Sequence, residues 1–438
     1  MIGYYFGLAL RSLRRAPVMT ALMVLAIGLG IGASMTMVTV LHVMTGDPLP
    51  ARSARLFHPR LDPLPESYGV RAGAPNPADD FTWVDAMALL RAHRAVRQAA
   101  MAGGLLLVRP QRAELHPFYA TGRYATADFF AMFGVPLMQG HAWSAADDQA
   151  HARVVVLGRE LARKLFGGEG GVGRTVRMGD ADYRVVGVAG DWRPRPQFYA
   201  DSAGKLYSDA DEFFLPLATA AELNLAVTGN QSGWGKAEGD RARYSDNLSW
   251  LQVWVQLDTP AQVAAYRRFL ADYAAQQKAP GRFEKKPESA ARLYGLMDWL
   301  AYENLVPADL RMQLWLALGF LFVCMVNIVA LLLAKFLRRS GEISVRRALG
   351  ARRRDIFAQL GLESVAIGLA GGVLGLLIAQ LGLWSVRHRP DDYAQLASMD
   401  VAMLTSTFAL AVTASALAGL LPAWRACRVA PALQLKTL

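Results

Sequence analysis

The chain contains little cysteine and few charged residues. Among its 438 residues there are two cysteines, Cys324 and Cys427, and only 19% of the residues are Asp, Glu, Lys or Arg. Two cysteines cannot build a framework of several disulfides, so a disulfide-stabilised secreted scaffold is excluded. Hydrophobic residues make up 53% of the chain, which excludes a disordered or collagen-like protein and favours a membrane protein. The length allows about two or three domains.

Charge is absent from several long runs of the sequence. No charged residue occurs in residues 17–44, 312–334 or 401–424, and residues 356–386 contain one, Glu363. A helix needs about 20 apolar residues to cross a bilayer, so each run predicts a transmembrane helix. The alternative for the first run is a cleaved signal peptide, but that run is much longer than the apolar core of about 7–15 residues found in signal peptides.

Acidic residues are scarce in the segments that flank these runs. Residues 1–15 contain three Arg and no acid, residues 335–355 contain eight basic and two acidic residues, and residues 425–438 contain three basic residues and no acid. Residues 45–311, in contrast, contain 31 basic and 30 acidic residues. Basic flanking segments are typical of the cytoplasmic side of a membrane protein. The formal net charge of +11 therefore indicates membrane orientation rather than nucleic-acid binding.

These patterns predict a membrane protein of four transmembrane α-helices, with a large α+β extracytoplasmic domain between the first and second helices. Both termini are expected in the cytoplasm. The segments outside the membrane are then an amphipathic N-terminus (1–16), the extracytoplasmic domain (45–311), a cytoplasmic loop (335–355), a short periplasmic connection (387–400) and a cytoplasmic tail (425–438).

Residues 45–311 show mixed periodicity. Apolar residues recur at helical spacing over 83–100 and 261–275. Strands are expected at 154–157 and 183–188, and at 251–257, where alternation indicates a half-buried strand. We expect an α+β domain of two lobes.

Motifs that would indicate an enzyme are missing. The segment from Gly168 to Thr175 fits the phosphate-binding loop except that Arg174 replaces its Lys, and a strand is expected after it where the motif requires a helix. His141 and His151, with Asp147 and Asp148 between them, fit an exposed loop better than a metal site. We predict no cofactor or catalytic residue, and ATP chemistry only in a partner.

The basic loop has a distinctive order of residues. The segment from Glu342 to Leu349 predicts a short helix that ends at Gly350, and residues 352–355 predict the start of the next helix. Residues 331–356 closely resemble the REI-x-IRRALGAS-RRDI signature of FtsX-like ABC transporter permeases of the macrolide-exporter (MacB) type. Residues 11–17 and 418–431, and parts of 124–175, resemble the same family.

That resemblance implies a function. In the family such a loop forms a coupling helix that docks on a cytoplasmic ABC ATPase dimer, and the residues expected to make this contact are Glu342, Arg346, Arg347, Gly350, Arg353 and Asp355. Arg can bind carboxylates in a bidentate manner, although basic residues could also serve only to orient the loop towards lipid headgroups. The implied protein is a permease of the bacterial inner membrane, with Mg-ATP bound by the partner.

The implied mechanism is mechanotransmission, in which ATP hydrolysis by the partner changes the conformation of the periplasmic domain for export or extraction of an antibiotic, peptide or lipoprotein. The alternative is a transmembrane signal transmitter that regulates a periplasmic enzyme or sensor kinase. A periplasmic adaptor and an outer-membrane channel are left open. The chain departs from the family at Ser340-Gly341 and in apparent insertions at 193–211 and 230–246, and no ATPase lies within these residues.

Polar and small residues inside the apolar runs suggest contacts between helices. Small residues four positions apart allow close helix packing, either within the chain or against a second permease subunit. The residues that form such pairs are Gly28, Gly32, Gly368, Gly371, Gly372 and Gly375. Glu363 lies about two turns into its run, where we expect a structural role and contact with water or with an Arg of the loop.

Overall fold

The computed structural model describes most of the chain. The described residues are 16–69, 76–112, 114–168, 170–200, 209–234, 242–279, 281–285, 290–303, 308–339, 341, 345, 349–350, 352–388 and 401–428. The predicted amphipathic N-terminus up to residue 15, nearly all of the 387–400 connection and the tail beyond residue 428 lie outside them. The chain forms two compact units, one of Met1–Thr45 with Val306–Leu438 and one of Gly46–Leu305.

The first unit contains four long helices, as the sequence predicts. They are α2 (Pro17–Thr45), α11 (Ala308–Arg338), α13 (Arg353–Arg387) and α14 (Val401–Arg428). Each contains a stretch long and apolar enough to cross a membrane. The second and third helices extend beyond the predicted runs because charged residues at their ends continue the helix, which shortens the predicted 335–355 loop to residues 339–352. Long Lys and Arg side chains can reach polar surroundings from such positions.

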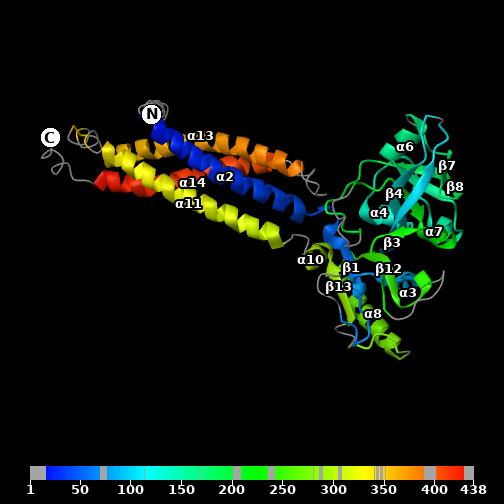
Figure 1. Ribbon diagram of the computed structural model, residues 1–438. Helices are drawn as coiled ribbons and strands as arrows, with labels where there is room; N and C mark the ends of the chain where they lie inside the picture. Colours follow the sequence, from blue (N-terminus) through cyan, green and yellow to red (C-terminus); the bar gives the residue numbers. More distant parts are fainter. Residues whose placement is uncertain are drawn as a thin grey trace. The chain divides into compact units, whose positions relative to one another are not determined.

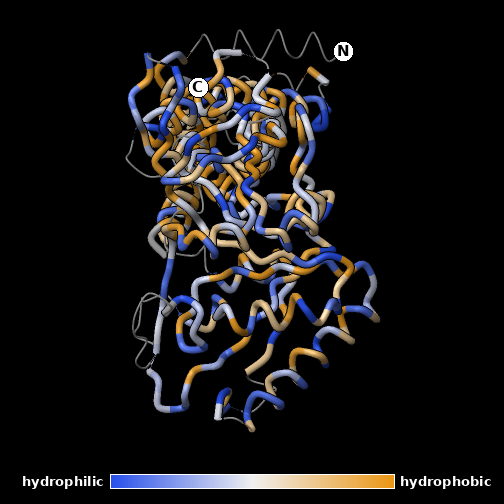
Figure 2. The backbone as a smooth tube through the Cα atoms, turned by 90° about the vertical axis from the view of Figure 1, so that its right-hand side faces the viewer, coloured by the Kyte–Doolittle hydropathy of each residue, from blue (hydrophilic) through white to orange (hydrophobic). Residues whose placement is uncertain are grey.

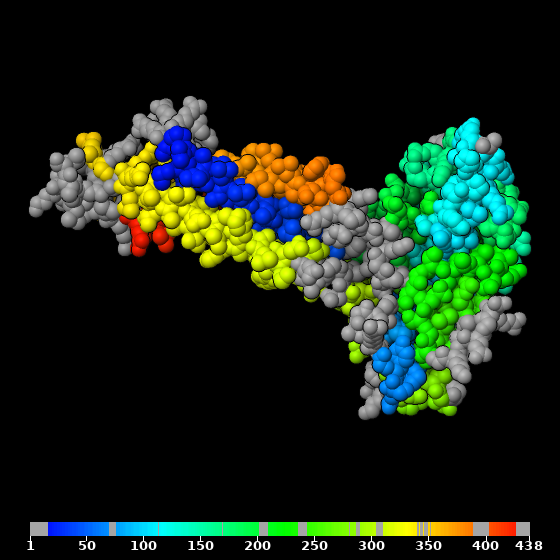
Figure 3. All heavy atoms as spheres, viewed as in Figure 1, coloured from blue at the N-terminus to red at the C-terminus, as the bar shows by residue number. Residues whose placement is uncertain are grey.

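The four helices pack as a bundle (Figure 1). Both α2 and α14 pack against α11 and against α13, so α11 and α13 lie at opposite corners. Figure 3 shows α2 between α11 and α13 on one face of this unit. The described side chains of all four helices contribute to one buried apolar cluster that includes Ile27, Leu332 and Ile367.

Glycines bring α13 close to α2. A Cβ atom on Gly28 would lie 2.8 Å from the Leu374 side chain, and one on Gly32 would lie 2.6 Å from Ile378. From the α13 side, Gly371 contacts Ile27, and a Cβ on Gly375 would lie 3.3 Å from the backbone oxygen of Gly28. These four predicted packing residues therefore face a helix of the same chain.

Glycines on a second face of α13 approach α14. A Cβ atom on Gly368 would lie 3.0 Å from the backbone oxygen of Ala411 and closer still to the Ser415 hydroxyl, and one on Gly372 would lie 3.0 Å from the Ala411 side chain. The Ser415 hydroxyl also donates to the Ser364 carbonyl oxygen at 2.9 Å. Both glycine faces of α13 are covered by the chain's own helices, which leaves no room there for a second subunit.

The second unit is built on one sheet of thirteen strands among the described residues. The strand order is β13-β1-β12-β3-β4-β9-β6-β8-β5, with β2, β7, β10 and β11 paired beside this path. The strands are β1 (Leu56–Leu61), β2 (Phe81–Thr82), β3 (Arg97–Arg109), β4 (Phe118–Ala125), β5 (Leu137–Gly140), β6 (Val154–Gly158), β7 (Thr175–Met178), β8 (Ala181–Ala189), β9 (Phe213–Pro216), β10 (Val227–Thr228), β11 (Ser232–Gly233), β12 (Leu248–Gln256) and β13 (Ala291–Gly295).

Helices cover both faces of this sheet. They are α3 (Trp83–Ala92), α4 (Asp128–Phe133), α5 (Ala145–Gln149), α6 (Arg159–Phe166), α7 (Leu217–Glu222), α8 (Pro260–Lys278) and α10 (Leu296–Tyr302), with 3-10 turns η1 (Ser53–Arg55), η2 (Pro77–Asp79) and η3 (Ala242–Tyr244). One buried cluster joins the strands to α3, α6, α7 and α8, and a more aromatic cluster joins them to α4 and α10. Figure 2 shows hydrophobic and hydrophilic residues interleaved along this unit, as expected of a domain with buried faces.

Several sequence predictions for this unit are confirmed. The strands expected at 154–157 and 183–188 are β6 and β8, and the helix expected at 261–275 is α8. The strands of this unit form one continuous path of pairing, and its division into two lobes stays a prediction. The strand expected at 251–257 is β12, but it is buried on both faces from Ser249 onward, because apolar clusters lie above and below it.

The helix expected over 83–100 is wrong in its second half. Helix α3 ends at Ala92, because His93 adopts the left-handed conformation with φ 46°. Residues from Arg97 onward form β3, which pairs with β12 and β4 along its length. Strand pairing therefore overrides helical spacing in this segment.

Close glycine packing on α13 gives a testable difference between two of its glycines. Gly368→Ala should destabilise the bundle by about 1–3 kcal/mol, because the added methyl overlaps α14. Gly361→Ala on the same helix is the control, since a Cβ there has nothing within 4 Å. Thermal unfolding in detergent should show a lower midpoint for Gly368→Ala only. Equal midpoints for the two variants would contradict this packing.

Candidate functional site

The loop between α11 and α13, residues 339–352, holds most of the residues predicted to couple to a partner. Of those residues, Glu342, Arg346 and Arg347 lie outside the part of the chain that the structure describes. Gly350, Arg353 and Asp355 are described. The site is therefore built from the described parts of the loop and from the helix ends on either side.

The described end of the loop agrees with the predicted helix stop. The Leu349 backbone N–H donates to the Val345 carbonyl oxygen at 3.0 Å, as in a helical turn. Gly350 then adopts φ 98°, a conformation that side chains rarely tolerate. Helix α13 starts at Arg353, and both Arg353 and Asp355 are exposed in its first turn. An acid in the first turn also complements the helix dipole.

The loop exposes two apolar side chains that the sequence analysis did not single out. Val345 is 52% exposed and Leu349 is 83% exposed. A spacing of four residues in a helical turn places them on one face. The spacing was visible in the sequence, but only the structure shows that both side chains are exposed.

A buried cluster of charges lies near the ends of α11 and α13 that the loop connects. Glu363 of α13 is fully buried and forms an ion pair with Lys335, which is in the last turn of α11 and 2% exposed. A second cation, Arg339, lies 3.5 Å from the Glu363 carboxylate. The expected contact between Glu363 and an Arg of the loop is confirmed, whereas Lys335 as its closer partner was not foreseen.

The look-alike of a phosphate loop is the connection from helix α6 to strand β7. Gly173 donates its backbone N–H to the Val185 carbonyl oxygen at 2.8 Å, and the Arg174 guanidinium lies over the Phe166 ring. Thr175 begins β7, so the expected strand after this segment is confirmed. Among the described residues of this segment, a strand rather than a helix N-terminus follows the glycines, so the backbone does not offer the phosphate site that the motif needs.

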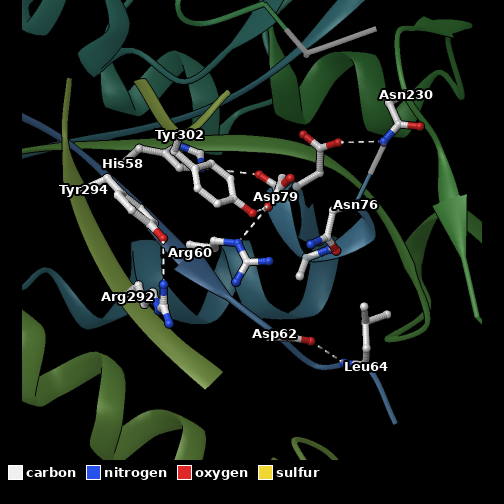
Figure 4. A network of polar contacts seen from close by, with 12 residues as sticks. His58, Arg60, Asp62, Leu64, Asn76, Asp79, Asn230, Arg292, Tyr294 and Tyr302 are labelled. Carbon is white, nitrogen blue, oxygen red and sulfur yellow. Dashed lines mark hydrogen bonds and ion pairs between the residues drawn. The ribbon is translucent and has the colours of Figure 1, made fainter. Parts of the chain in front are cut away.

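A polar network joins α10 to the first strand of the second unit (Figure 4). Arg60 of β1 donates to Asp79 at 2.7 Å, and the Tyr302 hydroxyl at the end of α10 donates to the same carboxylate oxygen at 3.1 Å. His58, on the same strand, packs against Trp299 with ring centroids 3.8 Å apart and the ring planes tilted by 37°. Burial lowers the pKa of His58 to about 3, so it is neutral at physiological pH. This network fixes α10, the last element of the unit, onto the sheet.

A cavity of about 510 Å³ lies against β3, β4 and β12. Arg123 is its buried cation, and Asp211 holds that guanidinium in a bidentate pair at 3.2 and 3.3 Å. The Tyr199 carbonyl oxygen accepts a further hydrogen bond from Arg123. These contacts hold the segment after β8 against β4, so the buried charge of Arg123 has a structural role.

Comparison with known proteins decides the family. The family model for the MacB-like periplasmic core domain matches residues 20–273, and the model for the FtsX-like permease C-terminal region matches residues 315–431. The chain belongs to the MacB/FtsX-type ABC transporter permeases. The strong agreement at both units confirms the family resemblance of the basic loop.

Individual relatives of this permease are distant. It is 28% identical over 445 residues to a macrolide export ATP-binding/permease protein MacB of Rhodospirillum rubrum, covering 99% of this chain and 60% of that protein. It is 27% identical over 375 residues to a pyoverdine export ATP-binding/permease protein PvdT of Pseudomonas entomophila, covering 83% of this chain and 49% of that protein. The permease thus spans about half to three fifths of the length of these relatives.

Solved structures of outer domains are also similar to the permease. The periplasmic region of MacB from Actinobacillus actinomycetemcomitans matches 59% of the chain with 14% identity and a TM-score of 0.37, covering 97% of that structure. The extracellular domain of the transporter YknZ from Gram-positive bacteria matches 54% of the chain with 15% identity and a TM-score of 0.34, covering 98% of that structure.

The His and Asp cluster of the permease has partners within the protein. Ser144 caps α5 and forms a capping box with Asp147, and His151 Nδ1 lies 2.6 Å from the Glu222 carboxylate. Asp148 accepts from the Ala127 backbone N–H at 2.7 Å and from Trp143 Nε1 at 3.0 Å. These contacts account for Asp147, Asp148 and His151 as parts of α5 and the turn that follows it.

Asp148 predicts a pH dependence of stability. Burial raises the pKa of Asp148 to about 6, and the two hydrogen bonds offset this only in part. Because the folded pKa lies above the unfolded value of about 3.9, the stabilising contribution is complete below about pH 4 and is lost as pH rises through about 6. Asp148→Asn should remove a pH-dependent change of about 2–3 kcal/mol in the free energy of unfolding. Melting temperatures of both proteins between pH 4.5 and 7.5 test this, and parallel curves would contradict it.

Proposed function

We propose that this chain is the membrane subunit that couples ATP hydrolysis by a separate cytoplasmic ABC ATPase dimer to a conformational change of its outer domain, and that this change drives export or extraction. The family supports a permease, and its relatives bear names of ATP-binding export proteins that extend well beyond the matched region. The observation that carries the proposal is the α11–α13 loop, which exposes Val345 and Leu349 beside exposed arginines.

The chemistry of the loop suits docking on a protein. An apolar pair of side chains gains free energy only when a partner covers it, at about 25 cal/mol per Å² buried. Arg352, Arg353 and Arg354 are exposed beside this pair and can form charge-assisted hydrogen bonds to carboxylates. A partner surface with an apolar groove and an acidic rim would satisfy both features. Basic residues that only orient the protein in the membrane would not need exposed apolar neighbours.

The orientation follows from the flanking charges. We place the protein in a bacterial inner membrane, with the loop and both termini on the cytoplasmic side and residues 46–305 on the outer side. The reason is that the basic segments flank the membrane spans on one side. The ATPase then acts at the loop and the substrate is handled at the outer domain. A second permease subunit, identical or related, is expected because two ATPases that work by twofold symmetry need two membrane halves.

The mechanism requires differential binding. ATP-bound partners must favour one arrangement of the loop and helices over another, because a ligand shifts an equilibrium only by its difference in affinity for the two states. The named relatives export macrolides or pyoverdine, and from them we carry over the direction of transport and not the substrate. Those names also favour export over signalling without transport.

The apolar pair gives a direct test of docking. Leu349→Glu should weaken binding of the ATPase by at least about tenfold, because a charge replaces an apolar side chain that would be buried. The full-length protein is purified gently from its native membrane, retained proteins are identified by mass spectrometry, and ATP hydrolysis is assayed. Met138→Glu, at a residue of the outer domain that is 53% exposed, is the matched control. Recovery of no ATPase with the wild-type protein would overturn the proposed function.

The arginines give a second test. Arg346→Glu together with Arg347→Glu should uncouple transport from ATP hydrolysis while membrane insertion stays intact, because reversed charges repel an acidic partner surface. Transport assays and membrane fractionation of the double variant measure the two effects separately. Unchanged transport would remove these two residues from the docking contact.

A further inference from the structure

Burying the charge of Glu363 costs free energy. Glu363 is the eleventh residue of α13 and has no exposed surface, and the apolar residues Leu360 and Ile367 lie about one turn away on either side. Removing a carboxylate from water costs several kcal/mol, even after the surrounding protein relaxes. Buried ion pairs can often be replaced by apolar residues without loss of stability. Stability alone therefore does not explain why this position carries a charge.

The cations that face Glu363 come from the opposite corner of the bundle. Lys335 and Arg339 are four residues apart, at the end of α11 and just beyond it, so they lie on one face. Helices α11 and α13 each pack on α2 and α14, and α2 lies between them on the face seen in Figure 3. The charged cluster thus joins the two diagonal helices directly, at the end where the loop connects them.

The loop between these helices has glycines near both of its ends. Gly341 follows α11 closely and Gly350, with φ 98°, precedes α13. Gly350 has no Cβ to restrict its backbone, so the chain can turn there when the loop is pushed. With the ends of α11 and α13 tied together, a push on the loop instead moves both helices.

We propose that Glu363, Lys335 and Arg339 act as an ionic tie that makes the end of α11, the loop and α13 one lever, and that they are positioning residues for coupling. This role rests on the proposed function, since the lever needs a motor that pushes it. The tie itself is a property of the permease alone. Its presence can therefore be tested without any ATPase.

Distance measurement between spin labels tests the tie. Labels are placed at the exposed positions Arg338 and Arg354 through Arg338→Cys and Arg354→Cys, after Cys324→Ala and Cys427→Ser, in the full-length chain in lipid nanodiscs. Glu363→Gln keeps the shape of the side chain and removes its charge. We expect its distance distribution to be about twofold broader than that of the parent protein. An unchanged width would overturn the proposal.

Two further variants separate charge from size and from general loss of stability. Glu363→Lys with Lys335→Glu and Arg339→Glu mirrors the cluster and should restore the narrow distribution, whereas a width equal to that of Glu363→Gln would overturn an ionic tie. Asp79→Asn removes a charge from the Arg60 ion pair of the other unit. It should leave the width unchanged, and equal broadening would show general destabilisation instead. If Glu363→Gln does not fold, Arg339→Gln replaces it, because Arg339 is partly exposed.

Coupling is measured in the complex with the ATPase that the wild-type protein retains. Glu363→Gln should keep the ATPase bound while the effect of the permease on ATP turnover falls at least about fivefold, and full retention of that effect would overturn the lever. If no ATPase is recovered, the proposed function fails and the distance measurement still decides whether the tie exists. The two failures are thus distinguishable.

Discussion

The close approach of α13 to two neighbouring helices is the constraint on which the membrane unit depends. Between helices in lipid there is no hydrophobic driving force, so association rests on van der Waals packing and on hydrogen bonds. Gly371 and Gly375 let α2 approach one face of α13, and Gly368 lets α14 approach another. The depth and rotation of α13 in the bundle follow from these contacts. They also set Glu363 opposite Lys335, since a rotation of α13 would carry the carboxylate away from the cations.

The outer unit meets a different constraint, because it must bury a wide sheet on both faces. The long strand β3 pairs with β12 through its first half and with β4 through its second, which joins the two parts of the sheet. Apolar residues of β6 alternate between the two buried clusters, as strand geometry requires. Arg60, Asp79 and Tyr302 then fix α10 onto β1.

The proposed function depends on the loop that connects α11 and α13. The loop of residues 339–352 offers exposed apolar side chains and arginines, and its root is held by buried charges. Exposed residues suit a partner that binds and releases, whereas buried charges suit a fixed geometry. The buried charges flank the exposed residues along the chain, with Lys335 and Arg339 before the apolar pair and Glu363 after the arginines. This arrangement is what makes a lever a physically sensible account of the site.

Local information in the sequence determined the four spans, the end of the loop helix at Gly350 and the start of α13, because hydropathy and turn chemistry depend on neighbouring residues only. The same information determined β6, β8 and α8. Only the tertiary structure decided which helix each glycine faces, which cation neutralises Glu363, that β12 is buried on both faces, and that residues 97–109 form a strand. Each of these depends on segments far apart in the chain that come together by packing and strand pairing. Local periodicity does not indicate which distant segments become partners.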